Sequence, residues 1–273
     1  MGDFPVMKLI YPFALLLACA QTDVDEARFE PFPIVYTGDN VIEPPEGVHP
    51  FYKKYINADG IVIVGSANVA DAALLTARSA ILRLTSKRPD VHQAIVANNA
   101  RISIMAFSET ASDLPEFGLG SDGEWGLGQM PGDATSLVSE KGIRYEGNTE
   151  YVANFLLHEF VHVVHNLGMP TTDPEIVDEI YAAYLNAVEE GRFMKPPNDA
   201  PEEATAFDEF RDDEYFTHSV NAYYDLNESL PGPWVDIKIG DWGQRSGTRE
   251  KLRQNDPVIY GIIEQFFPDA LND

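Results

Sequence analysis

The chain has 273 residues, of which 44% are hydrophobic, and this is enough for one large globular domain with an apolar core. Its 44 acidic residues outnumber its 19 basic residues, which gives a formal net charge of −25. A chain this acidic is repelled by nucleic acid and by anionic membrane surfaces, so we exclude nucleic acid as a partner. The charge itself is typical of a solvated surface rather than of a specific site.

Residues 1–20 have the pattern of an export signal. Lys8 precedes an apolar run over residues 9–18, which is too short to span a bilayer and ends in small residues. We therefore predict that residues 1–20 are a signal peptide, with Met7 as an alternative start. No transmembrane span is expected in the mature chain.

Two ways of processing fit the same residues. Cleavage after Ala20 matches the small residues there, whereas Cys19 with the residues before it resembles a bacterial lipobox. In the second case Cys19 is acylated and is a lipid anchor. Because Cys19 is also the only cysteine, the mature chain has no disulfide. We expect an exported protein that is secreted, periplasmic or a membrane-anchored lipoprotein.

Residues 21–50 are acidic and contain prolines, so they read as a linker that leads into a domain over residues 51–273. The first elements expected in that domain are a buried strand at 61–64, a helix from Ala67 with Ser66 as N-cap, a helix at 91–97 and a strand at 101–107. Residues 108–144 are rich in Gly, Asp and Ser and read as a long functional loop that lines a substrate cleft.

The second half of the chain is predicted to be mostly helical. The helices are expected at residues 150–167, 174–190, 212–225 and 256–266. Together these elements predict an α+β fold, with a small N-terminal sheet, helices packed on it, and a mainly helical C-terminal half.

The stretch NFLLHEFVHVVHNLGMP, residues 154–170, is the most informative part of the chain. Asn148 or Thr149 is expected to cap its helix, Gly168 to stop it, and Pro170 to prevent its continuation. The helix should bury its apolar residues, which are Phe155, Leu156, Phe160, Val161, Val163 and Val164. Its polar residues therefore lie in apolar surroundings.

His158 and His162 are four residues apart, so they share one face of this helix, with Glu159 beside them. This is the H-E-x-x-H pattern, in which two imidazoles bind Zn²⁺ and the glutamate acts on the water at the metal. Two core histidines with satisfied hydrogen bonds are the alternative. The spacing around a glutamate within a buried helix favours the metal site, with one Zn²⁺ per chain.

A catalytic zinc usually has three protein ligands and one open position. His165 lies two turns beyond His158, about 10 Å along the helix axis, and is better suited to a structural or supporting role. The acidic residues Asp178, Glu179 and Glu214 on the following helices are the other candidates for the third ligand. Their spacing alone does not choose among them.

Several segments carry a resemblance to a known family. They read VGSANVADAALLTA, RISIMAFSETASDLPEF, GLGQMPGDATS, LLHEFVHVVHNLGM, DEYFTHSVNAYYD and TREKLRQNDPVIYGII, and the likeness that they carry runs over residues 46–268. The chain resembles the exported zincin-type (gluzincin-like) metallopeptidases related to the catalytic domain of anthrax lethal factor. In that family H-E-[FY]-x-H is followed some fifty residues later by E-[YF]-F-A-E. The resemblance implies that Glu214 is the third zinc ligand and Glu159 the general base.

The chain departs from the family pattern at two places. Phe207 stands where the family has a tyrosine that stabilises the oxyanion, and the loss of such a donor costs about 3 kcal/mol. Tyr215, Tyr223 or Tyr224 is a candidate to replace it, with packing as the alternative.

The second departure is Thr217 and His218, which stand in place of the family's Ala and Glu. His218 lies one turn from Glu214, where it is expected to orient that carboxylate, to act as an extra ligand or to face water. Both departures bear on catalytic efficiency more than on metal binding.

The resemblance and the motif together predict an exported zinc metallopeptidase that hydrolyses peptides or proteins. The acidic chain favours basic or neutral peptides through its field. The alternative is an exported or lipid-anchored binding module that keeps a structural zinc site and has lost hydrolysis.

Overall fold

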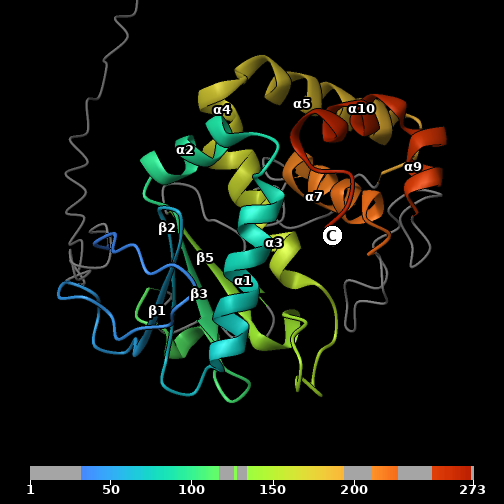
Figure 1. Ribbon diagram of the computed structural model, residues 1–273. Coiled ribbons are helices and arrows are strands. Elements are labelled where there is room, and N and C mark those ends of the chain that lie inside the picture. Colours follow the sequence, from blue (N-terminus) through green and yellow to red (C-terminus); the bar gives the residue numbers. More distant parts are fainter. Residues whose placement is uncertain (1–31, 117–125, 128–133, 194–210, 227–247, 272–273) are drawn as a thin grey trace, which may run out of the picture. The chain divides into compact units, whose positions relative to one another are not determined.

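The computed structural model describes residues 32–116, 126–127, 134–193, 211–226 and 248–271. The described strands form one mixed sheet in the order β1-β2-β3-β5-β4 (Figure 1). Their bounds are Lys54–Ala58 for β1, Ile61–Gly65 for β2, Arg101–Met105 for β3, Gly126–Leu127 for β4 and Thr135–Ser139 for β5. β2, β3 and β5 are parallel, whereas β1 and β4 are antiparallel to their neighbours.

The hairpin between β1 and β2 is closed by Asp59 and Gly60. Both have positive φ, 47° and 114°, as a two-residue hairpin turn with the right-handed twist of the strands requires. A Cβ at Gly60 would also lie 2.7 Å from Val96 Cγ2, so glycine is needed there for space as well. The sequence analysis missed β1, although Asp-Gly before a strand is a strong hairpin signal.

Both faces of the sheet are buried. On β2, Ile61 and Ile63 join the main core, while Val62 and Val64 join a second cluster with Tyr52 and Tyr55. This alternation explains why the strand is an unbroken apolar run, since neither of its faces meets water. The strands predicted at 61–64 and 101–107 are confirmed as β2 and β3.

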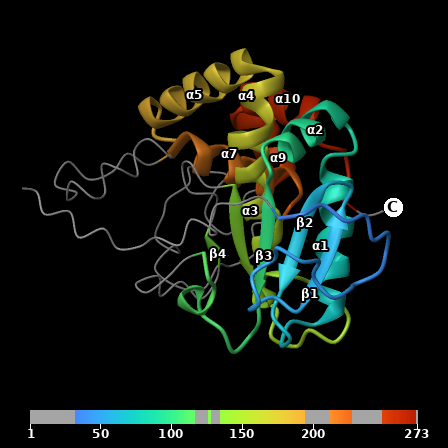
Figure 2. The same ribbon diagram turned by 90° about the vertical axis from the view of Figure 1, so that its left-hand side faces the viewer.

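Two helices cover the face of the sheet that carries the main core. α1, Asp71–Leu84, contacts β1 and β2, and α3, Phe155–Val163, contacts β5 and also α1 (Figures 1 and 2). The buried residues of α1 recur at helical spacing and are Ala73, Leu74, Ala77, Ile81 and Leu84. One side of α3 thus packs against the sheet.

The remaining helices lie in the C-terminal half, apart from α2 at Pro89–Ala97. They are α4 at Met169–Thr172, α5 at Pro174–Glu189, α7 at Arg211–Tyr223, α9 at Arg249–Asn255 and α10 at Pro257–Phe266. α7 contacts α3, α5, α9 and α10, and so lies among the other helices (Figure 1). The predicted α+β architecture, a sheet followed by a mainly helical half, is confirmed.

Two predictions about the first half were wrong. α1 begins at Asp71 instead of near Ala67, and Ser66 does not cap it; the Glu140 carboxylate, 70 residues away, accepts from the backbone N–H of Ala70 at 2.9 Å. The stretch 108–144 is not one long loop, because it contains β5, which pairs with β3 in the sheet. Short strands with Thr and Ser do not stand out in a Gly- and Ser-rich stretch.

The predicted bounds of the metal-motif helix also need correction. α3 begins at Phe155, and Asn154 is its cap, accepting from the backbone N–H of Leu157 at 3.1 Å. Asn148 instead holds the preceding turn through the carbonyls of Glu140 and Ile143. The cap therefore lies six residues after Asn148 and five after Thr149, the two candidates predicted.

Neither Gly168 nor Pro170 ends the helical path. A π-helical turn over Val164–Gly168 continues directly into α4, Met169–Thr172, which contains Pro170. Gly168 is required for space, since a Cβ there would lie 2.6 Å from Val91 Cγ1 on α2. Phe155, expected to be buried, is only half-buried.

The segment before β1, predicted as the end of a linker, contacts the sheet. Ile42 forms a β-bridge with Tyr55, the backbone N–H of Val35 donates to the Tyr55 hydroxyl at 3.0 Å, and Phe32 packs edge-on against Tyr52. Residues 31–273 accordingly group as one unit. Residues 1–31, with the predicted signal peptide and Cys19, lie outside the described residues.

Candidate metal centre

The face that α3 turns toward α7 carries His158 and His162. Their Nε2 atoms are 3.3 Å apart, and their rings meet edge-on with centroids 4.9 Å apart. The four-residue spacing predicted this convergence, because it places the two side chains on successive turns of one face. His162 is buried and His158 is partly open to solvent.

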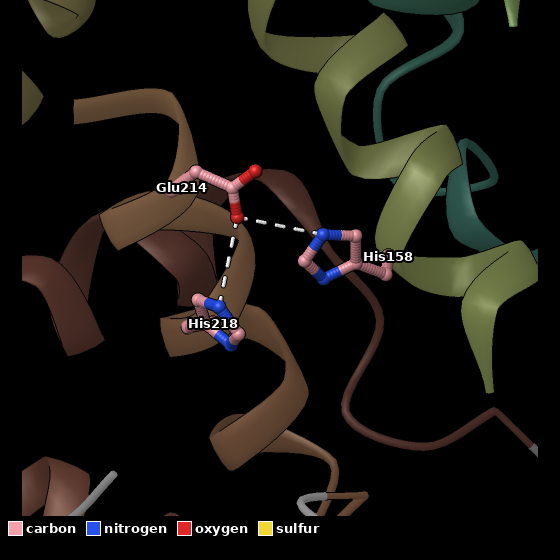
Figure 3. Close-up of side chains that lie close together, drawn as sticks. All are labelled: His158, Glu214 and His218. Carbon is pink, nitrogen blue, oxygen red and sulfur yellow. Dashed lines mark ion pairs between the residues drawn. The ribbon is translucent and has the colours of Figure 1, made fainter. Parts of the chain in front are cut away.

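α7 brings Glu214 to the same point. Glu214 Oε2 lies 3.5 Å from His158 Nε2, and Oε1 lies 3.6 Å from His162 Nε2. His218, one turn further along α7, has its Nε2 3.6 Å from Glu214 Oε2 (Figure 3). Of the acidic residues considered for a third ligand, Glu214 is therefore the one that meets the histidine pair.

These distances fit an ion better than they fit hydrogen bonds. Separations of 3.3–3.6 Å are at or beyond the long end of hydrogen bonds. Ligand atoms at about 2.0–2.2 Å from a tetrahedral ion are about 3.3–3.6 Å from one another. His158, Glu214 and His218 also offer ligand atoms that all lie within 4.8 Å of one another. The cluster therefore has the residues and the spacing of a metal-binding group.

Asp213, which the sequence analysis did not single out, contacts His162 on the Nδ1 side, away from Glu214. Its carboxylate accepts from His162 Nδ1 at 2.6 Å, from His165 Nδ1 at 2.9 Å and from Asn166 Nδ2 at 3.0 Å. A carboxylate on Nδ1 fixes the tautomer that leaves the lone pair on Nε2 for a metal. No local spacing pointed to Asp213, since consecutive residues of a helix do not share a face and Asp213 lies in the acidic run Asp212-Asp213-Glu214.

His165 has the supporting position expected from its distance along the helix. It lies in the π-helical turn, 3% exposed, with Nδ1 bound to Asp213 and its ring 5.4 Å from that of Phe216. Its Nε2 has no hydrogen-bond partner among the described residues. His165 thus helps to hold Asp213 and is not part of the group around Glu214.

Asn221 is a second residue that sequence reasoning missed. Its side-chain amide lies 3.3 Å from His158 Nδ1, and its Oδ1 is buried without a partner among the described residues. The amide nitrogen is the atom that faces Nδ1 here, so when His158 ligates through Nε2 and Nδ1 carries the proton, the Asn221 amide must turn over to present Oδ1 as the acceptor. α7 thus supplies a supporting residue behind each histidine of the pair.

Burial and neighbouring charges shift the ionisation of these groups strongly. The pKa of Glu159 is raised to about 8, chiefly by burial. The charge of His162 opposes this rise, and the Glu214 and Asp213 carboxylates contribute to it. Burial alone would lower the pKa of His162, but the Asp213 carboxylate raises it to about 10. Glu159, 6% exposed, is the group with the properties of a base in this cluster.

The other two histidines are shifted the opposite way. Burial, helped by the charge of His162, lowers the pKa of His218 to about 4 and that of His158 well below its usual range. Both imidazoles are therefore neutral at pH 7. The neutral imidazole is the form that binds metal, so an ion bound at His162 must displace the proton that the raised pKa of His162 keeps on the ring at pH 7.

Several predicted candidates lie elsewhere. Asp178 and Glu179 are exposed on α5 and are not among the residues of the cluster. The Tyr215 hydroxyl donates to Asp256 at 2.6 Å, and the Tyr223 hydroxyl to Asp269 at 3.3 Å, so these two hydroxyls are engaged away from the histidines.

Tyr224 likewise donates to the backbone carbonyl of Pro268 at 2.7 Å. The prediction for Phe207 concerns a position outside the described residues, and residues 117–125 and 128–133 of the loop predicted to line the cleft also lie outside them.

Comparison with protein families, with curated proteins and with solved structures gave no match. Among the described residues, no helix is both long enough and apolar enough to cross a membrane. The function must therefore be argued from the cluster itself.

Proposed function

We propose that the chain is an exported zinc-dependent metallopeptidase of the zincin type. The observation that carries this proposal is the set of separations among His158 Nε2, His162 Nε2 and the Glu214 carboxylate, all 3.3–3.6 Å. Two imidazoles and a carboxylate are a donor set that zinc prefers in catalytic sites. Export rests on the predicted signal in residues 1–20.

A bound Zn²⁺ would supply Lewis acidity toward the peptide carbonyl and lower the pKa of a water molecule beside it. Asp213 holds the His162 imidazole in the tautomer that ligation needs, and Asn221 does so for His158 once its amide presents Oδ1 to Nδ1. Glu159 takes the proton from the attacking water and passes it to the leaving amine. Burial raises the pKa of Glu159 in the metal-free cluster, and the charge of a bound Zn²⁺ would lower it toward the ionised form that a base requires.

The experiment compares the purified protein with its Glu159→Gln variant in zinc content and in the digestion of a peptide library. We expect one zinc per chain in both and a loss of cleavage of at least about 100-fold in the variant. Glu175→Gln, the same change at an exposed position on α5, is the matched control and should cleave like the wild type. Absence of zinc from the wild type would refute the proposal.

The second candidate function is a binding module with a structural zinc site. The position of His218 beside Glu214 favours it, because a fourth protein ligand is a feature of closed, structural sites. One zinc per chain without cleavage of any library peptide would support the module over the enzyme.

A further inference from the structure

α7 places His218 beside Glu214. It is four residues after Glu214, on the same face of the helix, and is 7% exposed. Glu214 Oε2 is at nearly equal distances from two imidazoles, 3.5 Å from His158 Nε2 and 3.6 Å from His218 Nε2 (Figure 3). The carboxylate thus lies between one histidine from each helix.

A hydrogen bond that merely orients Glu214 does not account for this position of His218. Donor–acceptor distances in N–H···O bonds are about 2.7–3.2 Å, and the Nε2–Oε2 separation here is 3.6 Å. A separation of 3.6 Å is what two ligands of one ion show. The contact between His218 and Glu214 therefore repeats the spacing found between Glu214 and the two histidines of α3.

The rings of His158 and His218 also contact each other edge-on beside the Glu214 carboxylate. Their centroids are 5.2 Å apart and their planes meet at 66°. Both ligand nitrogens lie within 4.8 Å of each other and of the Glu214 carboxylate.

We propose that His218 is a fourth protein ligand, which completes a coordination shell of His158, His162, Glu214 and His218 and closes the centre in its resting state. Water or a substrate carbonyl enters only when the His218 imidazole leaves its place. This inference rests on the metal-binding part of the proposed function. It makes the centre a closed one that opens by exchange of one ligand.

The first test is zinc affinity, measured by competition with a chromophoric chelator on the whole protein. Loss of a residue that only supports a ligand costs about 10–100-fold in metal affinity, so loss of a direct ligand should cost at least about 10-fold. We expect this loss in His218→Ala and in His218→Gln. His49→Ala, which removes an exposed histidine far along the chain from the cluster, is the matched control and should bind zinc like the wild type.

The second test asks whether the centre is open, and it does not depend on hydrolysis. Cobalt replaces zinc, and acetohydroxamate is added while the visible absorption spectrum is recorded. We expect little change in the wild type, whose shell is full, and a clear shift in His218→Gln, where a position is free. A wild-type spectrum that shifts as much as that of the variant would overturn the closed centre.

The outcomes separate this inference from the proposed function. Zinc in the wild type with unchanged affinity in both His218 variants would refute His218 as a ligand and leave the three-ligand peptidase intact. Absence of zinc from the wild type would refute the proposed function itself. Far-ultraviolet circular dichroism of the metal-free variants shows whether the fold is kept, and His218→Gln serves if the alanine variant is unfolded.

Discussion

The layer between α1 and the sheet and the interface between α3 and α7 are both buried, yet their interiors are built from different residues. The first is apolar throughout, with Ile61, Ile63 and Ile104 packed on residues such as Leu74 and Ile81 of α1. The second contains the buried polar residues Glu159, His162, His165, Asp213, His218 and Asn221.

The difference shows that the interface between α3 and α7 stabilises the fold less than an apolar interface would, in exchange for groups that can bind a metal and act as a base. Apolar burial stabilises by about 25 cal/mol per Å², whereas a buried charge costs free energy unless it is paired and hydrogen-bonded. A fold that needed only stability would place apolar residues between α3 and α7. The concentration of ionisable groups there is explained by a site, and metal binding would compensate part of its cost.

The largest effect on stability is expected in the apolar layer. Ile63→Ala should lower the free energy of unfolding by about 2–5 kcal/mol, because it removes a fully buried side chain and leaves a cavity. Zinc content of the folded protein should not change. Chemical denaturation measures this loss of stability. Ile63→Val removes less of the same side chain and should lower the free energy of unfolding by only about 0.5–1.5 kcal/mol. Loss of zinc in a folded Ile63→Ala variant would break the distinction between the two regions.

The next prediction concerns the polar interface. Asp213→Asn should weaken zinc binding about 10–100-fold, since the carboxylate that fixes His162 becomes a neutral amide. Chelator competition measures this. Asp212→Asn removes the same charge one residue earlier and should leave the affinity within a factor of about 3. Equal losses in the two variants would mean that charge alone, rather than the contact with His162, sets the affinity.

Tyr215 tests where the boundary of the site lies. Tyr215→Phe should cost about 1–2 kcal/mol of stability, because the buried Asp256 carboxylate loses one donor while its ion pair with Arg192 remains. Cleavage by the folded variant should be unchanged. A fall in kcat of about 100-fold with normal zinc content would instead show that this hydroxyl stabilises the oxyanion.

The smallest effect is expected at the surface. The hydrogen bond from Arg88 lowers the pKa of Asp90 to about 2, below its usual value near 4. A lowered folded-state pKa means that the carboxylate stabilises the fold above pH 4 and that this contribution is lost as the pH falls toward 2.

Because Asp90 is exposed, the contribution should be well under about 1 kcal/mol. The difference in unfolding free energy between the wild type and Asp90→Asn, measured at pH 6 and pH 3, should shrink at the lower pH. A larger difference at pH 3 would contradict this sign.

Local patterns were sufficient where the signal lies within one element. β2 follows from its unbroken apolar run, whereas the helices near 91–97 and 174–190 and the pairing of His158 with His162 follow from a periodicity of about four residues. The same reasoning would have found β1 from Asp59-Gly60. It failed for β5, whose place in the sheet comes from pairing with β3 rather than from its own residues.

The sequence by itself determined the H-E-x-x-H face of α3, because the spacing of a helix is a property of its backbone. Only the tertiary structure decided that Asp213, Glu214, His218 and Asn221 meet that face, and that Asp178 and Glu179 do not. The physical reason is that the contact between α3 and α7 joins residues about fifty to sixty positions apart. The packing of α7 against α3, on a core shared with the sheet, places them together.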